Sequence, residues 1–168
     1  MKRRRIINYF LSLLVLVMVL SCGSATTSSQ DAGQVSELLN SRHFEIENNW
    51  TLPLSGNRIN LIGNPNHIRV MGDSVDVFLP YFGVRHSGGG YNSENGIVYK
   101  GIARDFNIVA HDTKNIYDLS FKGSQGGESL NFFITVYSNG NTNTSVNSSQ
   151  RQSISYTGKI KDLPRKEE

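Results

Sequence analysis

The fold class of this chain can be predicted from residues 68–79, IRVMGDSVDVFL. Apolar residues alternate with polar ones on both sides of Gly72-Asp73, and glycine with aspartate is typical of a tight turn. Alternation with a period of two places every second side chain on the same face of a strand. The stretch therefore predicts a β-hairpin with one buried face.

The same alternation recurs from Arg42 onward, in segments separated by turns rich in Gly, Asn, Asp and Ser. Asn139-Gly140 is a second strong hairpin signal. The further predicted strands lie near Phe44–Ile46, Ile59–Leu61, Ile97–Lys100, Asp105–Ala110, Ile116–Phe121, Leu130–Tyr137, Thr142–Asn147 and Ser153–Ile160. About ten such strands predict an all-β domain, an antiparallel meander curled into a barrel or a two-layer sandwich. The predicted core is Phe44, Ile46, Ile59, Leu61, Ile68, Val70, Val77, Leu79, Phe132, Ile134 and Ile154.

Residues 1–21 are typical of a bacterial lipoprotein signal peptide. The basic run Lys2–Arg5 precedes an apolar stretch, Ile6–Leu20, that is shorter than the roughly 18 apolar residues a membrane span needs. Val19-Leu20-Ser21-Cys22 resembles a lipobox, in which the cysteine is lipidated and the chain is then cut before it. The alternative is a spare buried cysteine. We expect cleavage before Cys22 and acyl chains on its thiol, which anchor the protein to a membrane.

The mature chain is predicted to have three parts. Residues 22–30 are small and polar and predict a flexible tether, residues 31–162 a single all-β domain, and residues 163–168 a charged C-terminal tail. A short helix from Asp31 to about Ser41 is expected to open the domain, because Asp31 and the glutamine three positions later resemble a capping pair. Its apolar stripe is Val35, Leu38 and Leu39. The alternative for this segment is more disordered tether.

The charge of the mature chain argues against nucleic-acid binding. Loss of residues 1–21 removes four basic and no acidic residues, which leaves 13 basic against 14 acidic side chains. A protein that binds nucleic acid needs a basic face, which this balance does not predict. With only one cysteine, the chain has no internal disulfide, so its stability depends on the core.

Six local strings stand out in the predicted β domain: SRHF at 41–44, NRINL at 57–61, IRV at 68–70, LPYFG at 79–83, GI at 96–97 and RQSISY at 151–156. Together they resemble a family of Bacteroidetes lipoproteins that carry domain of unknown function 4251. The resemblance implies an all-β domain in the cell envelope and no particular activity. Surface-displayed lipoproteins of that group tend to carry an acidic signal after the cysteine, whereas Gly23–Thr26 follows here. We therefore expect the periplasmic face of the outer membrane.

The segment 79–91, LPYFGVRHSGGGY, is the most unusual in the chain. As a loop at the mouth of a barrel it predicts a binding site, with aromatic side chains stacking on a ligand and basic ones supplying charge. The candidate ligand-binding residues are Tyr81, Phe82, Arg85, His86 and Tyr91. The alternative is that the two leading aromatics pack into the core.

Arg151 is a further candidate for the same concave site, since an arginine binds a carboxylate or phosphate through two parallel hydrogen bonds. The more common outcome is an ion pair with an acidic neighbour, for which we expect Glu45 or Asp105. In the first case the guanidinium is accessible to a ligand. In the second it is hydrogen-bonded to an acidic side chain of the protein.

No pattern in the sequence predicts catalysis. The histidines, His43, His67, His86 and His111, are far apart and lack paired-ligand spacing, so neither a metal site nor a cofactor is expected. No serine lies in a G-x-S-x-G turn. We therefore expect a non-catalytic envelope module that binds a small ligand or another envelope protein. The alternatives are a hydrolase of envelope polymers with His86 as base, and a purely structural lipoprotein.

Asp73-Ser74-Val75 resembles the pattern at which the same bacterial group attaches O-linked glycans to exported proteins. The string falls at a predicted exposed turn, so Ser74 is a candidate glycosylation site. The alternative is an ordinary turn residue with a free hydroxyl.

Overall fold

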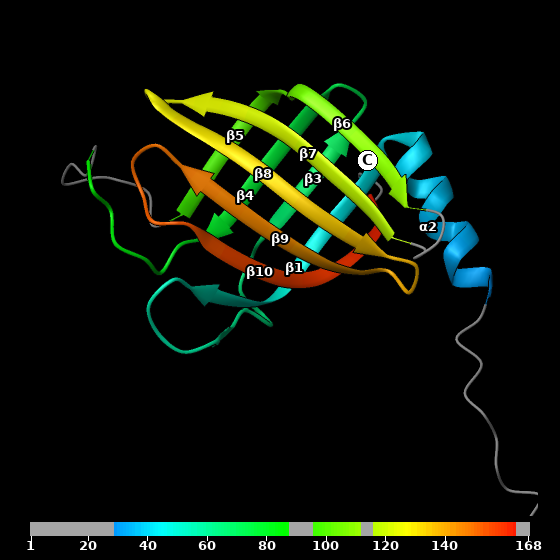
Figure 1. The fold of residues 1–168 in the computed structure, drawn as a ribbon, viewed down its shortest axis with the longest axis horizontal. Coiled ribbons are helices and arrows are strands. Elements are labelled where there is room, and N and C mark those ends of the chain that lie inside the picture. Colours follow the sequence, from blue (N-terminus) through cyan, green and yellow to red (C-terminus); the bar gives the residue numbers. More distant parts are fainter. Residues whose placement is uncertain (1–28, 88–95, 112–115, 164–168) are drawn as a thin grey trace, which may run out of the picture.

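The structure, a computed structural model, describes residues 29–87, 96–111 and 116–163. This part of the chain forms one helix and ten strands (Figure 1). The elements are α2 (Ser29–Ser41), β1 (His43–Pro53), β2 (Ile59–Asn60), β3 (His67–Met71), β4 (Ser74–Pro80), β5 (Gly96–Ile102), β6 (Arg104–His111), β7 (Ile116–Gln125), β8 (Glu128–Tyr137), β9 (Asn141–Ser148) and β10 (Ile154–Asp162).

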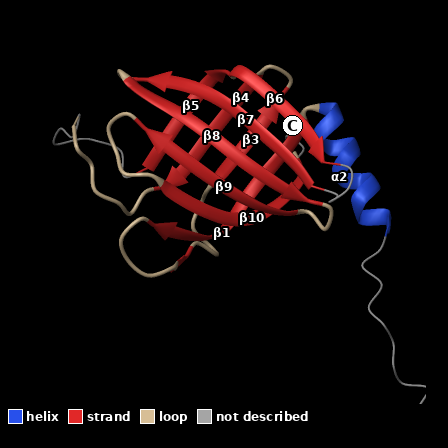
Figure 2. Cartoon of the chain, in the orientation of Figure 1, coloured by secondary structure: helices blue, strands red, loops and turns tan. Residues whose placement is uncertain are grey.

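The strands form one antiparallel sheet in the order β5-β4-β3-β1-β10-β9-β8-β7-β6, and the short β2 pairs with β1 beside this path. The two outer strands, β5 and β6, are consecutive in the sequence and are joined through Ala103. The sheet therefore curls back toward itself and is nearly closed into a barrel (Figure 2). The predicted all-β class and strand meander are confirmed, in the form of a nearly closed barrel.

Both hairpins predicted from turn residues are present. Gly72 and Asp73 form the two-residue link between β3 and β4, where Met71 faces Ser74. Gly72 has a φ of 66° and Gly140, in the turn between β8 and β9, has a φ of 78°. This left-handed backbone region carries a steric cost for side chains with a Cβ, which explains glycine at both turns.

The core fills the barrel with the inward-facing residues of each strand. Ten of the eleven residues predicted from the alternation are buried, and Phe121 and Phe132 stack there with ring centroids 4.5 Å apart. Burying an aromatic or aliphatic side chain of this size contributes about 1.5–3 kcal/mol. The exception is Ile59, which is half-buried. It lies on β2, whose two residues pair only with β1.

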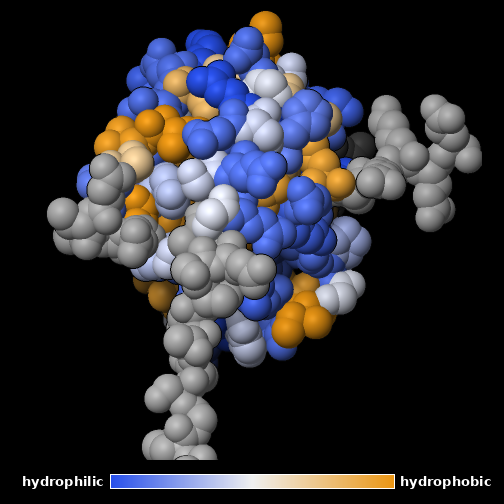
Figure 3. All heavy atoms as spheres, turned by 90° about the vertical axis from the view of Figure 1, so that its right-hand side faces the viewer, coloured by the Kyte–Doolittle hydropathy of each residue, from blue (hydrophilic) through white to orange (hydrophobic). Residues whose placement is uncertain are grey.

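The helix α2 covers one end of the barrel and begins two residues earlier than the predicted start at Asp31. Its apolar stripe, Val35, Leu38 and Leu39, is buried and belongs to the core. The surface at this end is largely hydrophilic, with separate hydrophobic patches (Figure 3). In the described part of the chain, no helix is long and apolar enough to cross a membrane. Residues 54–58, 81–87 and 149–153, which follow β1, β4 and β9, lie at the opposite end, which we call the loop end.

Candidate functional site

The loop end brings together most of the binding residues predicted from the sequence. Arg85 and Arg151 face each other in an isolated antiparallel bridge. The backbone N–H of His86 donates a hydrogen bond to the carbonyl oxygen of Gln150 at 2.7 Å. Residues 81–87, the described part of the predicted binding loop, therefore lie beside Arg151. Tyr91 lies outside the described residues, and the His86 side chain is exposed.

The guanidinium of Arg151 is engaged on all three nitrogens. Nε donates to Oε1 of Glu128 at 2.8 Å, and Nη2 donates to Oε2 of the same carboxylate at 3.0 Å. Nη1 donates to the carbonyl oxygen of Gly96 at 2.7 Å. The side chains of Arg151 and Glu128 are 8% and 7% exposed, so the pair is buried. This geometry favours the ion-pair reading of Arg151 over the ligand reading.

The partner of Arg151 predicted from the sequence, Glu45 or Asp105, is wrong. Glu45 lies on the outer side of β1, where Arg69 and Lys161 bind it. Asp105 pairs with Lys122 at 2.8 Å. Glu128 is the partner because β8 begins at the loop end, a relation that depends on strand register and not on local sequence.

Two further side chains complete this cluster, which we call the Arg151 clasp (Arg85, Glu128, Ser148 and Arg151). Nη2 of Arg85 lies 3.3 Å from Oε2 of Glu128, and the Ser148 hydroxyl donates to Oε1. Burial raises the pKa of Glu128, but the hydrogen bonds from Arg151 and Ser148 and the two positive charges outweigh burial and hold this pKa below its ordinary value of 4.5. The carboxylate is therefore charged at neutral pH.

The aromatic residues of the loop lie beside the clasp. The Tyr81 hydroxyl donates to the carbonyl oxygen of Val84 at 2.8 Å, and the Cζ of Arg151 lies 5.2 Å from the Tyr81 ring centroid. Phe82 is 45% exposed. Both aromatics border a hollow of about 660 Å³, whose lining is Ile59, Asn60, Asn64, Pro65, Phe78, Pro80, Tyr81 and Phe82.

The remaining predicted sites are placed as follows. Ser74 is exposed at the first position of β4, directly after the Gly72-Asp73 turn. Cys22 lies outside the described residues. Within residues 29–87, 96–111 and 116–163, no three His, Cys, Asp or Glu side chains gather in a way that would hold a metal ion.

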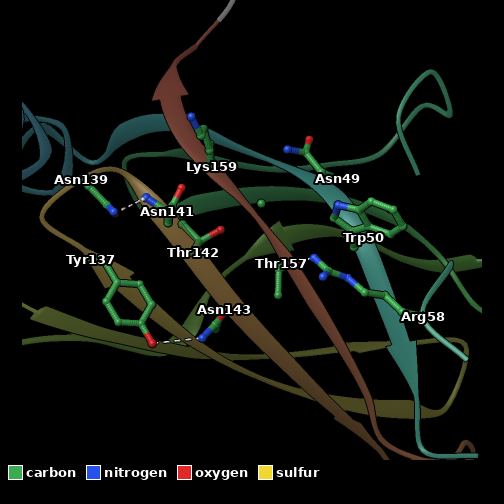
Figure 4. Close-up of a pocket in the computed structure, with 11 residues that line it drawn as sticks. Asn49, Trp50, Arg58, Tyr137, Asn139, Asn141, Thr142, Asn143, Thr157 and Lys159 are labelled. Atoms are coloured by element: carbon green, nitrogen blue, oxygen red, sulfur yellow. Dashed lines mark hydrogen bonds between the residues drawn. The ribbon is translucent and has the colours of Figure 1, made fainter. Parts of the chain in front are cut away.

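A second concavity, which the sequence did not predict, lies on the outer face of β1, β10 and β9 near the β8–β9 turn (Figure 4). We call it the outer groove, and it encloses about 480 Å³. On β9 and β10 the exposed Asn141, Asn143 and Lys159 alternate with buried residues. The lining is Asn49, Trp50, Arg58, Tyr137, Asn139, Asn141, Thr142, Asn143, Thr157, Gly158 and Lys159.

A β-bulge in β1 shapes the outer groove. Asn48 faces Gly158 across the pair with β10 and Trp50 faces Thr157, so Asn49 is an extra residue in β1. In a regular strand two successive side chains point to opposite faces, whereas here Asn49 and Trp50 both line the groove. Glycine at 158 is required sterically, because a Cβ there would lie 2.1 Å from the carbonyl oxygen of Glu47.

The side chains of the outer groove are held by contacts with one another. The Arg58 guanidinium carbon lies 4.4 Å from the Trp50 ring centroid, and Nη2 of Arg58 donates to the Thr157 hydroxyl at 3.2 Å. Nδ2 of Asn143 donates to the Tyr137 hydroxyl at 3.0 Å. These contacts orient both aromatic rings before any ligand arrives.

The comparisons with known proteins concern the fold and not the site. A family model described as Domain of unknown function (DUF4251) matches residues 26–160. The chain belongs to the DUF4251 family. The part of the predicted resemblance that concerns the DUF4251 domain is therefore confirmed. No curated protein matches the chain.

One solved structure similar to this DUF4251 chain is the crystal structure, at 1.95 Å resolution, of a DUF4251 family protein from Bacteroides eggerthii DSM 20697. The two share 18% sequence identity with a TM-score of 0.63, over 80% of this chain and 89% of the other. At this identity the likeness supports the fold alone.

Two signals for the outer groove are present in the DUF4251 sequence. Residues 129–161 contain no Asp or Glu, and Trp50 is the only tryptophan. Asn141 and Asn143 alternate with threonines, but asparagine is so common in turns that it indicates a loop as readily as a functional face. The bulge that adds Asn49 to the groove depends on the pairing of β1 with β10, so local sequence does not reveal it.

Proposed function

We propose that this chain is a non-catalytic module of the cell envelope that binds saccharides in its outer groove. The observation that carries the proposal is the lining of the groove: two oriented aromatic rings, four asparagine side chains and two cations on one concave surface. The groove lies outside the Arg151 clasp and uses none of its residues.

The chemistry of the lining favours a saccharide as the ligand. A sugar ring has flat faces of C–H groups and a rim of hydroxyls that both donate and accept hydrogen bonds. Trp50 and Tyr137 offer rigid, amphipathic contact area at low entropic cost. An asparagine amide also donates and accepts from one side chain, so it is suited to hydroxyl partners.

The shape of the outer groove favours several linked sugars over one. Trp50 lies on β1 and Tyr137 at the end of β8, with β10 and β9 between them. Three strand spacings separate β1 from β8, which is a distance of about 14 Å across the sheet. That span exceeds one sugar ring, so the two aromatic rings would contact different units of a chain.

The candidate ligand-binding residues at the loop end make their contacts within the protein. Arg151 and Glu128 satisfy one another, and Tyr81 is bound to the backbone beside them. We propose that Arg85, Arg151 and Tyr81 stabilise the loop end and do not contact the ligand.

We further propose that acyl chains on Cys22 hold the module at the periplasmic face of the outer membrane. The support is the lipobox string and the polar residues between Cys22 and α2. Each buried methylene contributes about 0.8 kcal/mol, so two or more acyl chains anchor a protein firmly. The test is the intact mass of protein from its native host. It should begin at Cys22 with the added mass of acyl chains, and an unmodified thiol in a chain that begins elsewhere would contradict the anchor.

Affinity electrophoresis tests the saccharide-binding function. The mature chain with Cys22→Ser is run through gels that contain dextran, xylan or polygalacturonate, and at least one polysaccharide should retard it. Trp50→Ala should abolish the retardation. The matched control is Phe133→Ala, because Phe133 is an aromatic residue that is 51% exposed on β8 and does not line the groove.

Two results would refute this function. The first is normal mobility of the Cys22→Ser chain in all three gels. The second is equal loss of retardation in the Trp50→Ala and Phe133→Ala variants, which would show that the groove is not the site.

A further inference from the structure

We infer that the outer groove selects saccharides that carry carboxylate groups, and that Arg58 and Lys159 bind those carboxylates. The inference rests on the proposed saccharide-binding function and adds the chemical class of the ligand. Its basis is an imbalance of charge in the groove. Arg58 and Lys159 are the charged residues of the lining, which contains no Asp or Glu.

This imbalance is local, because the mature chain as a whole is close to neutral. Residues 129–161, which supply β9, most of β10 and the turn before β9, contain no acidic residue. The backbone groups and amides that surround the two cations offer dipoles but no negative charge. An anion that enters the groove therefore meets uncompensated positive charge.

Strand register explains why Lys159 is not neutralised by its neighbours. Glu47 on β1 lies directly opposite Lys159 on β10. The Glu47 carboxylate is bound instead by Nζ of Lys161 at 2.6 Å, and Lys161 also lies 3.2 Å from Glu45. Lys161 therefore carries the ion pairs on this face of β10, and Lys159, two residues earlier on the same face, forms none within the described chain.

The charge of Arg58 is also not neutralised by an acidic neighbour, for a different reason. Its contacts within the groove are with the Trp50 ring and the Thr157 hydroxyl, and neither carries a negative charge. A guanidinium has five N–H donors in a planar fork that matches the two oxygens of a carboxylate. The guanidinium lies over the Trp50 ring, so a sugar would contact the part of the ring that Arg58 leaves open, with the fork next to it.

The two features together define the ligand class. Aromatic rings and amides recognise the sugar ring and its hydroxyls, while Arg58 and Lys159 recognise an acid attached to it. A neutral sugar would leave both cations without a partner, and a simple polyanion would leave the rings and amides unused. An acidic oligosaccharide uses all of them.

Isothermal titration calorimetry on the mature chain with Cys22→Ser tests the inference with three hexamers of similar length. Hexagalacturonate offers sugars with carboxylates, maltohexaose offers sugars alone, and hexaglutamate offers carboxylates alone. Hexagalacturonate should bind at least tenfold more tightly than either of the others. Because a charge-assisted hydrogen bond is about twice as strong as a neutral one, Arg58→Gln and Lys159→Gln should each weaken its binding by roughly tenfold.

The matched control is Lys122→Gln, which removes an exposed lysine that lies outside the outer groove and pairs with Asp105. Its affinity for hexagalacturonate should stay within about twofold of the parent. Raising the salt concentration should weaken hexagalacturonate binding, as for any exposed charge pair.

The possible failures are distinguishable from one another. Equal affinity for maltohexaose and hexagalacturonate, lost in Trp50→Ala but unchanged in Arg58→Gln and Lys159→Gln, would overturn the inference and leave the saccharide-binding function intact. Hexaglutamate binding as tight as hexagalacturonate would overturn the inference by showing a simple anion site. No binding of either sugar hexamer, together with unretarded migration in the polysaccharide gels, would overturn the function as well.

Discussion

Arg151 and Arg58 place the same kind of side chain in opposite environments within one barrel. Arg151 is buried, and each of its three nitrogens donates to Glu128 or to the Gly96 carbonyl. Arg58 is exposed and rests on the Trp50 ring. What differs is the surroundings: a buried carboxylate faces Arg151, while the outer groove has none in its lining. An arginine satisfied by the protein stabilises the fold, and one left without a carboxylate is available to a ligand.

The largest expected effect is on the stability of the clasp. Arg151→Ala leaves the Glu128 carboxylate buried without its main partner and should lower the free energy of unfolding by about 3–5 kcal/mol. Arg58→Ala should lower it by less than about 1 kcal/mol, because the side chain is exposed. Urea denaturation measures both. Similar losses in the two variants would remove the distinction between a structural and a ligand-binding arginine.

The next largest effect concerns the floor of the outer groove. Gly158→Ala places a Cβ 2.1 Å from the Glu47 carbonyl oxygen, so β10 must shift away from the bulge. Overpacking of this kind costs about 1–3 kcal/mol. Gly33→Ala is the control, since a Cβ at this position of α2 has nothing within 4 Å and alanine should stabilise a helix. If Gly158→Ala unfolded at the same urea concentration as the parent, close approach at the bulge would not be required.

The pH dependence of stability should also distinguish the Arg151 clasp from the outer groove. The pKa of Glu128 is lower in the folded chain than its ordinary value of 4.5, so the folded state favours the charged form. Its contribution to stability is fully present above pH 4.5 and is lost as the pH falls through the lower pKa of the folded state. Urea denaturation between pH 7 and pH 3 measures this effect. The free energies of unfolding of the parent and of Glu128→Gln should differ most at pH 7 and approach one another toward pH 3.

Arg58→Gln is the control for this pH dependence, because the outer groove contains no carboxylate. The free energy of unfolding of Arg58→Gln should differ from that of the parent by a constant amount between pH 7 and pH 3. A constant difference between the parent and Glu128→Gln down to pH 3 would contradict the assignment of this titration to the clasp.

Local patterns in the sequence predicted the all-β strand meander better than they predicted its sites. The alternation around Gly72-Asp73 depends only on neighbouring residues, so the hairpin and the buried Ile68, Val70 and Val77 followed directly. One concave site shared by the 81–91 loop and Arg151 was also predicted; residues 81–87 lie beside Arg151, but Arg151 does not line the hollow that Tyr81 and Phe82 border.

Cross-strand relations were not predictable in the same way. Glu128 as the partner of Arg151 follows from the position at which β8 begins, and the outer groove follows from a single extra residue, Asn49, in β1. Each depends on strand register, which shifts every facing residue when it changes by one. Ile59 differs from its prediction because a two-residue strand buries little.

The smallest expected effect is modification of Ser74, which lies in neither region. Its hydroxyl belongs to an exposed residue after a tight turn, and Asp73-Ser74-Val75 resembles an O-glycosylation pattern. We expect protein from the native host to be heavier than the Ser74→Ala variant by the mass of a glycan, with unfolding and hexagalacturonate binding unchanged. If mass spectrometry showed that the two proteins differ only by the oxygen atom lost in Ser74→Ala, Ser74 would not be a glycosylation site.

Trp50 is the only tryptophan in the chain, so tryptophan fluorescence reports on the outer groove alone. Titration of hexagalacturonate into the mature chain with Cys22→Ser is the most direct test of a saccharide-binding groove. A saturable change in Trp50 emission is predicted, with a midpoint equal to the calorimetric dissociation constant and raised in the Asn141→Ala variant. Calorimetric binding with no change in Trp50 emission would place the ligand elsewhere and contradict the account.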